Sequence, residues 1–194
     1  KKLGQDADSL GTITLDAANK LQTALPAITS SSKVALESIK GFSDDTSTVI
    51  NTIKKALEDN QLSPEEKNQI NVLITNFVTK IAQQRASIET TIDYLKKIEA
   101  SNGNHDLDSA IKNLSTLDSL LGDLSNRMNH LNDLVQNASV SDVENYLDKL
   151  DDVVTNISNI ASQINVDEIN STINQALTTL INTITNAKGL LNQA

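Results

Sequence analysis

Few side chains of this 194-residue chain could bind a metal ion through nitrogen or sulfur, because it has two histidines and no cysteine. His105 lies in an Asn-Gly-Asn-His-Asp turn, and His130 falls on the polar side of a leucine-striped helix. A metal site on a helix needs partners three or four residues away on a shared face, and neither histidine has one. We therefore expect solvated or capping histidines, with no metal ligand and no cofactor-binding residue.

Two acidic turns resemble calcium-binding loops, one starting at Asn102 and the other at Asp59. An EF-hand loop needs Gly at its sixth position and Glu at its twelfth. Other residues stand there: Leu107 and Asn113 in the first turn, Pro64 and Ile70 in the second. Helix caps explain the same polar residues, so we expect no calcium site.

Catalytic groupings are also missing from the sequence. Asp148, Asp151 and Asp152 are close together, but paired carboxylates need a pocket that separates their pKa values. The chain has no Gly-rich phosphate loop, no GxSxG elbow and no Ser/Lys dyad. We expect no catalytic residue and therefore no enzyme.

The strongest pattern is an apolar stripe with steps of three and four residues, which keeps one helix face apolar and requires a partner helix. It is clearest in the third predicted helix, at Leu107, Ala110, Leu114, Leu117, Leu121, Leu124, Met128, Leu131 and Val135. The first helix carries it at Leu3, Ala7, Leu10, Ala17, Leu21, Ala24 and Ile28. The second carries it at Ile70, Ile74, Phe77, Ile81, Ile88, Leu95 and Ile98, and the fourth begins it at Val143, Leu147, Leu150, Val154, Ile157, Ala161 and Ile164. Thr14, Gln84 and Thr91 are polar residues at such positions. They either fix the register of the helices or reflect loose packing, and we favour loose packing because only a buried, paired polar residue fixes register.

The stripes and capping signals predict four long helices. We expect them over 3–60 with kinks near 26 and 41, 64–101, 106–137, and 142–193 with a possible hinge near 165. Capping boxes at Ser63–Glu66 and Ser141–Glu144 start the second and fourth helices, Asp106 caps the third, and Asp167 re-caps the last stretch. Short connections make neighbouring helices antiparallel. The prediction is an all-α, elongated antiparallel bundle, a coiled-coil-like rod forming one stalk over residues 1–194.

Composition and charge exclude several classes of protein. The net charge of −9 and the absence of a basic stripe argue against nucleic-acid binding and against adsorption to anionic membranes. No apolar run approaches the length of about 20 residues that a transmembrane helix needs. The chain opens at Lys1 without Met, so we expect a fragment whose membrane contact is made only by flanking segments.

Leucine repeats interspersed with Asp, Asn and Ser form a recurrent pattern, as in Leu114–Leu124, Ile173–Leu180 and the closing Ala187–Ala194. In this pattern the sequence resembles the extracellular region of the YhgE/Pip (phage infection protein) family of Gram-positive bacteria. That family includes type VII secretion relatives of the EsaA and YueB kind. The resemblance implies a loop displayed outside the cell between membrane segments, serving phage adsorption or a secretion apparatus. It transfers no catalytic residue.

We therefore expect a non-enzymatic extracellular stalk or spacer that self-associates, most simply as a homodimer, and that meets phage tail or secretion proteins. One alternative is a secreted helical effector or pore-forming toxin, which would need a strongly apolar segment that the sequence lacks. The other is a soluble coiled-coil scaffold, which shares the stripe but would lack flanking membrane helices.

Overall fold

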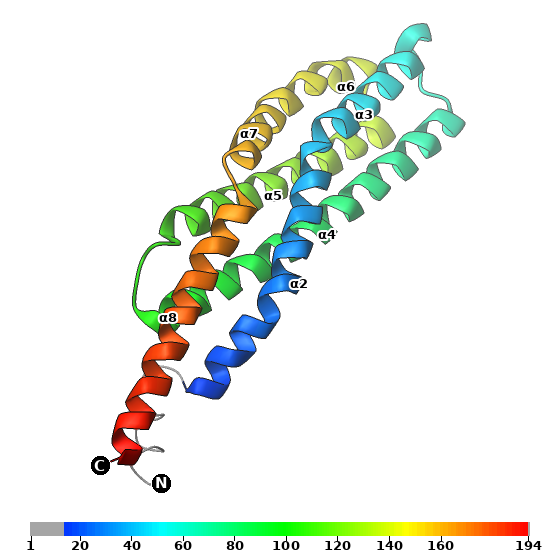
Figure 1. Cartoon of the computed structure of the whole chain (residues 1–194). Helices are drawn as coiled ribbons and strands as arrows, with labels where there is room; N and C mark the ends of the chain where they lie inside the picture. The colour runs from blue at the N-terminus through cyan, green and yellow to red at the C-terminus, as the bar shows by residue number, and fades with distance from the viewer. Residues whose placement is uncertain (1–13, 194) are drawn as a thin grey trace. The chain divides into compact units, whose positions relative to one another are not determined.

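The computed structural model describes residues 14–193, and every regular element in that range is helical. The elements are α2 (Leu15–Lys40), α3 (Phe42–Ala56), η1 (Leu57–Asp59), α4 (Pro64–Asn102), α5 (Asp108–Asn137), α6 (Val140–Leu147), η2 (Asp148–Leu150), α7 (Asp151–Ser162) and α8 (Val166–Gln193) (Figure 1). The predicted all-α helical bundle is confirmed. Leu3, Ala7 and Leu10 of the first predicted stripe lie outside the described residues. The predicted elongation stays a prediction.

The helices pack as two compact units. That residues 1–194 form a single stalk stays a prediction. One unit holds the described residues up to 33, residues 90–112 and those from 165 onward; the other holds 34–89 and 113–164. The last boundary between the units lies at the break at 163–165 between α7 and α8. Because α8 pairs with α2 while α7 packs on α3, the two helices belong to different cores.

In the first unit, α2 and α8 run antiparallel. Thr29 of α2 bonds Asn170 of α8, and the next turn of α2 places Lys33 against Asp167, earlier in α8. As the residue numbers rise along α2, the numbers of their partners on α8 fall, so the two helices are antiparallel. The same unit contains the end of α4 and the start of α5.

In the second unit, α4 and α5 also run antiparallel. Three hydrogen bonds join them in falling order: Gln136 donates to the Lys67 carbonyl, Asn132 donates to Asn71, and Arg85 donates to Asp118. The core of this unit includes an edge-to-face contact between Phe42 and Phe77, with ring centroids 5.3 Å apart. Such geometry suits the ring quadrupoles and adds to the burial of the two largest apolar side chains here.

The first long helix is interrupted at Gly41, near the predicted weak point, but it runs continuously through Pro26. The helix is therefore not broken at Pro26, and the predicted kink there stays a prediction. Its buried positions recur every seven residues across Gly41: Ala18, Leu25, Ser32, Ile39, Thr46 and Ile53. The predicted stripe named Ala17 and Ala24 instead, one residue too early; both are only half-buried.

The stripes of α4 and α5 follow the sequence closely. The apolar positions predicted for α4 are buried, and so are those of α5 except Ala110, which is half-buried. The capping box at the start of α4 is present, since Ser63 Oγ accepts the Glu66 N–H at 3.1 Å and Glu66 Oε1 accepts the Ser63 N–H at 2.9 Å. However, α5 begins at Asp108, two residues after the predicted cap Asp106.

The predicted fourth helix, 142–193, is three helices. The expected hinge near 165 is the break before α8, and a second break at η2 was not predicted. Leu147, Leu150 and Val153 are buried, each three residues after the one before. Val154, which was predicted to be buried, is half-buried. A 3₁₀ turn has three residues per turn, so η2 keeps all three on one face, which an α-helix would not do.

Two predicted caps of this region also move. Ser139, not Ser141, caps α6: its Oγ accepts the Asp142 N–H at 3.3 Å. Asn165, not Asp167, caps α8 by accepting the Glu168 N–H at 3.1 Å. In both cases a short polar side chain two residues earlier satisfies the first backbone donors.

Candidate functional site

A buried pair of hydroxyl groups lies in the first unit. Ser32 Oγ on α2 and Thr91 Oγ1 on α4 are 2.6 Å apart, and each residue is 3 % exposed. Loose packing, the interpretation favoured from sequence, does not describe Thr91, because this residue is both buried and paired. The contact forms only when α2 and α4 bring the two hydroxyls together, so the pair favours the register interpretation. Ser32 follows Leu25 by one heptad, but its role was not predicted from the sequence.

Polar contacts surround this pair in the same unit. Thr29 Oγ1 donates to Asn170 Oδ1 at 2.9 Å, and the Lys33 ammonium lies 2.6 Å from the Asp167 carboxylate. The Tyr94 hydroxyl donates to the Leu21 carbonyl at 2.6 Å, and burial raises the pKa of Tyr94 to about 12. These contacts tie α2 to α8 and to α4 by specific geometry as well as by apolar burial.

The other two predicted seam residues have different places. Thr14 is exposed and lies at the start of α2, where its Oγ1 accepts the Ala17 N–H at 3.2 Å. It is therefore a helix cap and not a seam residue. Gln84 is half-buried in α4.

In the second unit, the guanidinium of Arg85 lies over Gly122. Arg85 Nε donates to Asp118 Oδ1 at 3.0 Å, and this hydrogen bond raises the pKa of Arg85 above its ordinary value. A Cβ atom at Gly122 would lie 2.8 Å from Arg85 Nη1. The glycine inside α5 therefore leaves room for the arginine, a role that the sequence did not reveal.

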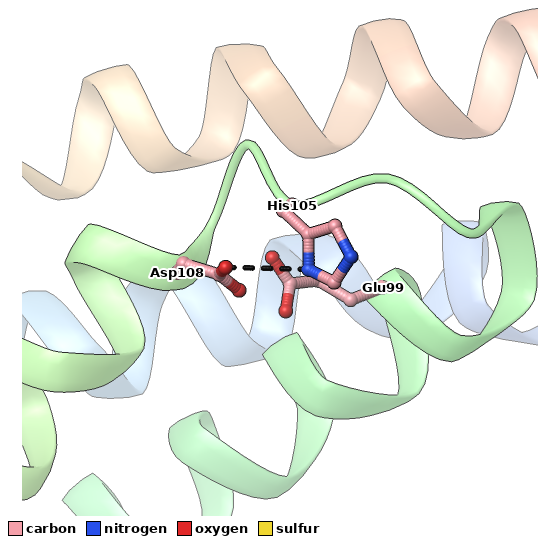
Figure 2. Close-up of side chains that lie close together, drawn as sticks. All are labelled: Glu99, His105 and Asp108. Carbon is pink, nitrogen blue, oxygen red and sulfur yellow. Dashed lines mark ion pairs between the residues drawn. The ribbon is translucent and has the colours of Figure 1, made fainter.

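The turn between α4 and α5 brings three potential metal ligands together, as Figure 2 shows. Glu99 comes from the last turn of α4, His105 from the connecting turn, and Asp108 is the first residue of α5. The ligand atoms of all three lie within 4.8 Å of one another. His105 Nδ1 lies 3.2 Å from Asp108 Oδ2. Asp108 stands three residues after His105, but a turn joins them, so the spacing expected for ligands on one helical face did not predict this cluster.

Glu99 is held at this position by the backbone. Its Oε2 accepts the Leu107 N–H at 3.0 Å, and the residue is half-buried. Burial raises the pKa of Glu99, and the neighbouring Asp108 raises it further, while the Leu107 N–H and His105 lower it. Two carboxylates and an imidazole therefore share one small region.

The turns that resemble calcium loops are local backbone structures. Asn102 Oδ1 accepts the Asn104 N–H at 3.1 Å, and Asp59 Oδ1 accepts the Gln61 N–H at 3.1 Å. Each side chain therefore bonds its own backbone two residues on, as Asx turns do.

The remaining sequence candidates are dispersed. His130 is exposed, with its ring centroid 4.7 Å from that of Tyr146. Asp148, Asp151 and Asp152 are exposed. A hollow of about 470 Å³ in the second unit is lined by Glu58 and Glu66 among others. Glu58 is exposed, and Glu66 is half-buried and accepts the Ser63 N–H in the capping box.

The chain matches no protein-family model, no curated protein and no solved structure. Among the described residues, no helix combines the length and the apolar character that crossing a bilayer requires.

Proposed function

We propose that this chain is a non-enzymatic spacer in the extracellular part of a Gram-positive membrane protein, where it presents a surface for phage adsorption or supports a secretion apparatus. One observation carries the proposal: α4 continues without interruption for 39 residues. At 1.5 Å per residue, such a helix is about 58 Å long. Its buried stripe extends from Ile70 to Ile98, so packing supports most of that length.

A spacer must keep its length, and the contacts along α4 serve that need. Capping fixes its start at Ser63, hydrogen bonds and one ion pair join it to α5, and the Ser32–Thr91 pair restricts how it aligns with α2. These features support a mechanical role. The extracellular location and the phage or secretion role are supported by the resemblance of the polar-interspersed leucine repeats to those of the YhgE/Pip family.

The length of α4 is testable because the chain has no cysteine. The exposed residues Glu65 and Lys96, near the two ends of α4, are replaced by cysteine and spin-labelled. A rigid helix gives one narrow distance distribution centred near 46 Å, from 31 residues at about 1.5 Å each. A broad or much shorter distribution would contradict the spacer role.

The location is tested in the cells that produce the protein. Asn76, exposed on α4, is replaced by cysteine in the full-length natural protein, with the unsubstituted protein as the control. We expect a membrane-impermeant maleimide to label the variant in intact cells. Labelling that requires permeabilised cells would overturn the extracellular location and favour an intracellular scaffold.

Self-association is the last part of the proposal. Leu190 on α8 is 69 % exposed, so a contact between two copies at this helix would bury its side chain. We expect sedimentation velocity to show a dimer at high concentration and Leu190→Ser to weaken it. A monomer at every concentration would contradict this expectation.

A further inference from the structure

We propose that Glu99, His105 and Asp108 form a binding site for a divalent metal ion of the zinc class at the turn between α4 and α5. The site would supply one imidazole nitrogen and carboxylate oxygens, with water completing the coordination shell. This inference goes beyond the spacer role and does not depend on it.

The distances between the side chains suit one shared ion. Two ligand atoms that are each about 2.0–2.1 Å from a tetrahedral Zn²⁺ lie about 3.3 Å apart. His105 Nδ1 and Asp108 Oδ2 are 3.2 Å apart, and the third ligand atom is within 4.8 Å of both. A small rotation of the Glu99 carboxylate would complete a three-residue set.

A hydrogen bond between His105 and Asp108 accounts for their separation, and the Leu107 N–H accounts for the position of Glu99. Glu99 brings a second carboxylate to the same point, and like charges at short range repel each other. The Leu107 N–H nevertheless holds Glu99 there, and Figure 2 shows its carboxylate directed toward the other two side chains. A divalent cation would replace that repulsion with attraction to both carboxylates.

The ligand types select the metal. Calcium and magnesium take oxygen ligands, six or more for Ca²⁺ and an octahedral set for Mg²⁺. An imidazole nitrogen suits Zn²⁺, Ni²⁺ and Co²⁺ instead. Binding would link the last turn of α4, the connecting turn and the first residue of α5, and would therefore stabilise this corner of the first unit.

The test is isothermal titration of the EDTA-treated chain with ZnCl₂. We expect saturable binding of one ion per chain, weakened at least about tenfold by His105→Ala and by Glu99→Gln. His105 is 81 % exposed at its side chain, so its replacement leaves the core intact, and circular dichroism checks the fold of each variant. The matched control is His130→Ala, which removes the only other histidine and leaves the affinity unchanged.

A second readout assigns the ligand directly. Zn²⁺ should shift the His105 imidazole resonances in NMR spectra and leave those of His130 in place. No saturable binding, or equal affinity in His105→Ala, would overturn the site. Equal affinity for Ca²⁺ or Mg²⁺ would overturn the proposed metal class.

Discussion

The hydroxyl oxygens of Ser32 and Thr91 lie 2.6 Å apart in a layer where the neighbouring heptad positions are apolar. Leu25 and Ile39 precede and follow Ser32 by seven residues, and both are buried. A buried hydroxyl without a partner costs about 1–3 kcal/mol, so a shift of the two helices that separates Ser32 from Thr91 would be unfavourable. Thr46 occupies the same heptad position two repeats later, and its Oγ1 is buried without a hydrogen-bond partner among the described residues.

Thr91→Val should therefore destabilise the protein. Valine keeps the volume of threonine but removes the hydroxyl that pairs with Ser32, which leaves the serine hydroxyl buried. We expect the free energy of unfolding to fall by about 1–3 kcal/mol. Urea unfolding followed by circular dichroism measures the change, and Ser32→Ala combined with Thr91→Val should recover part of it.

Thr46→Val is the matched control for this prediction. The change is the same, but the threonine removed has no partner to lose, so the free energy of unfolding should stay the same or rise. Equal destabilisation by the two valine substitutions would mean that the Ser32–Thr91 contact has no specific role.

The sequence predicted the helices and their inner faces well because apolar spacing sets both. The prediction was less accurate wherever two nearby residues of the same type could occupy one buried or capping position. Val153 is buried in place of Val154 because η2 tightens the helix, and periodicity alone assumes an even 3.6 residues per turn. Ser139 caps α6 in place of Ser141 because both offer a hydroxyl and only the path of the chain selects one.

Contacts between helices could not be predicted from the sequence. The spacing of His105 and Asp108 was visible, but the position of Glu99 depends on how the turn folds back onto α4. Thr91 was recognisable as a polar seam residue, whereas its pairing with Ser32, 59 residues away, required the register of α2 against α4.

Gly122→Ala tests the close approach of Arg85. Alanine favours a helix interior over glycine by about 0.8–1.0 kcal/mol, but its Cβ would displace the guanidinium and disturb the bond to Asp118. We expect little or no gain in the free energy of unfolding in the natural chain, and a gain near the full value in an Arg85→Ala background. Urea unfolding of the four proteins gives the coupling. Equal gains in both backgrounds would contradict the contact.

The caps of α6 give a paired comparison. Ser139→Ala removes the acceptor for the Asp142 N–H and should lower the free energy of unfolding by about 1 kcal/mol. Ser141→Ala changes an exposed residue inside the helix and should leave stability within about 0.5 kcal/mol of the natural value. Thermal unfolding of both variants decides between the two serines, and a larger loss for Ser141→Ala would restore the cap predicted from sequence.

Tyr94 should make stability depend on alkaline pH. Burial raises its pKa to about 12, above the ordinary value of 10, so the folded protein holds the phenol proton more tightly than the unfolded chain. The free energy of unfolding should therefore be constant with respect to this group below pH 10 and fall as the pH rises from 10 to about 12. The chain has two tyrosines, so in Tyr146→Phe the phenolate absorbance reports Tyr94 alone. We expect its titration midpoint near 12 in the folded protein, with circular dichroism showing intact helix, and near 10 in urea. A midpoint near 10 in the folded protein would mean that Tyr94 is not held in the buried contact with Leu21.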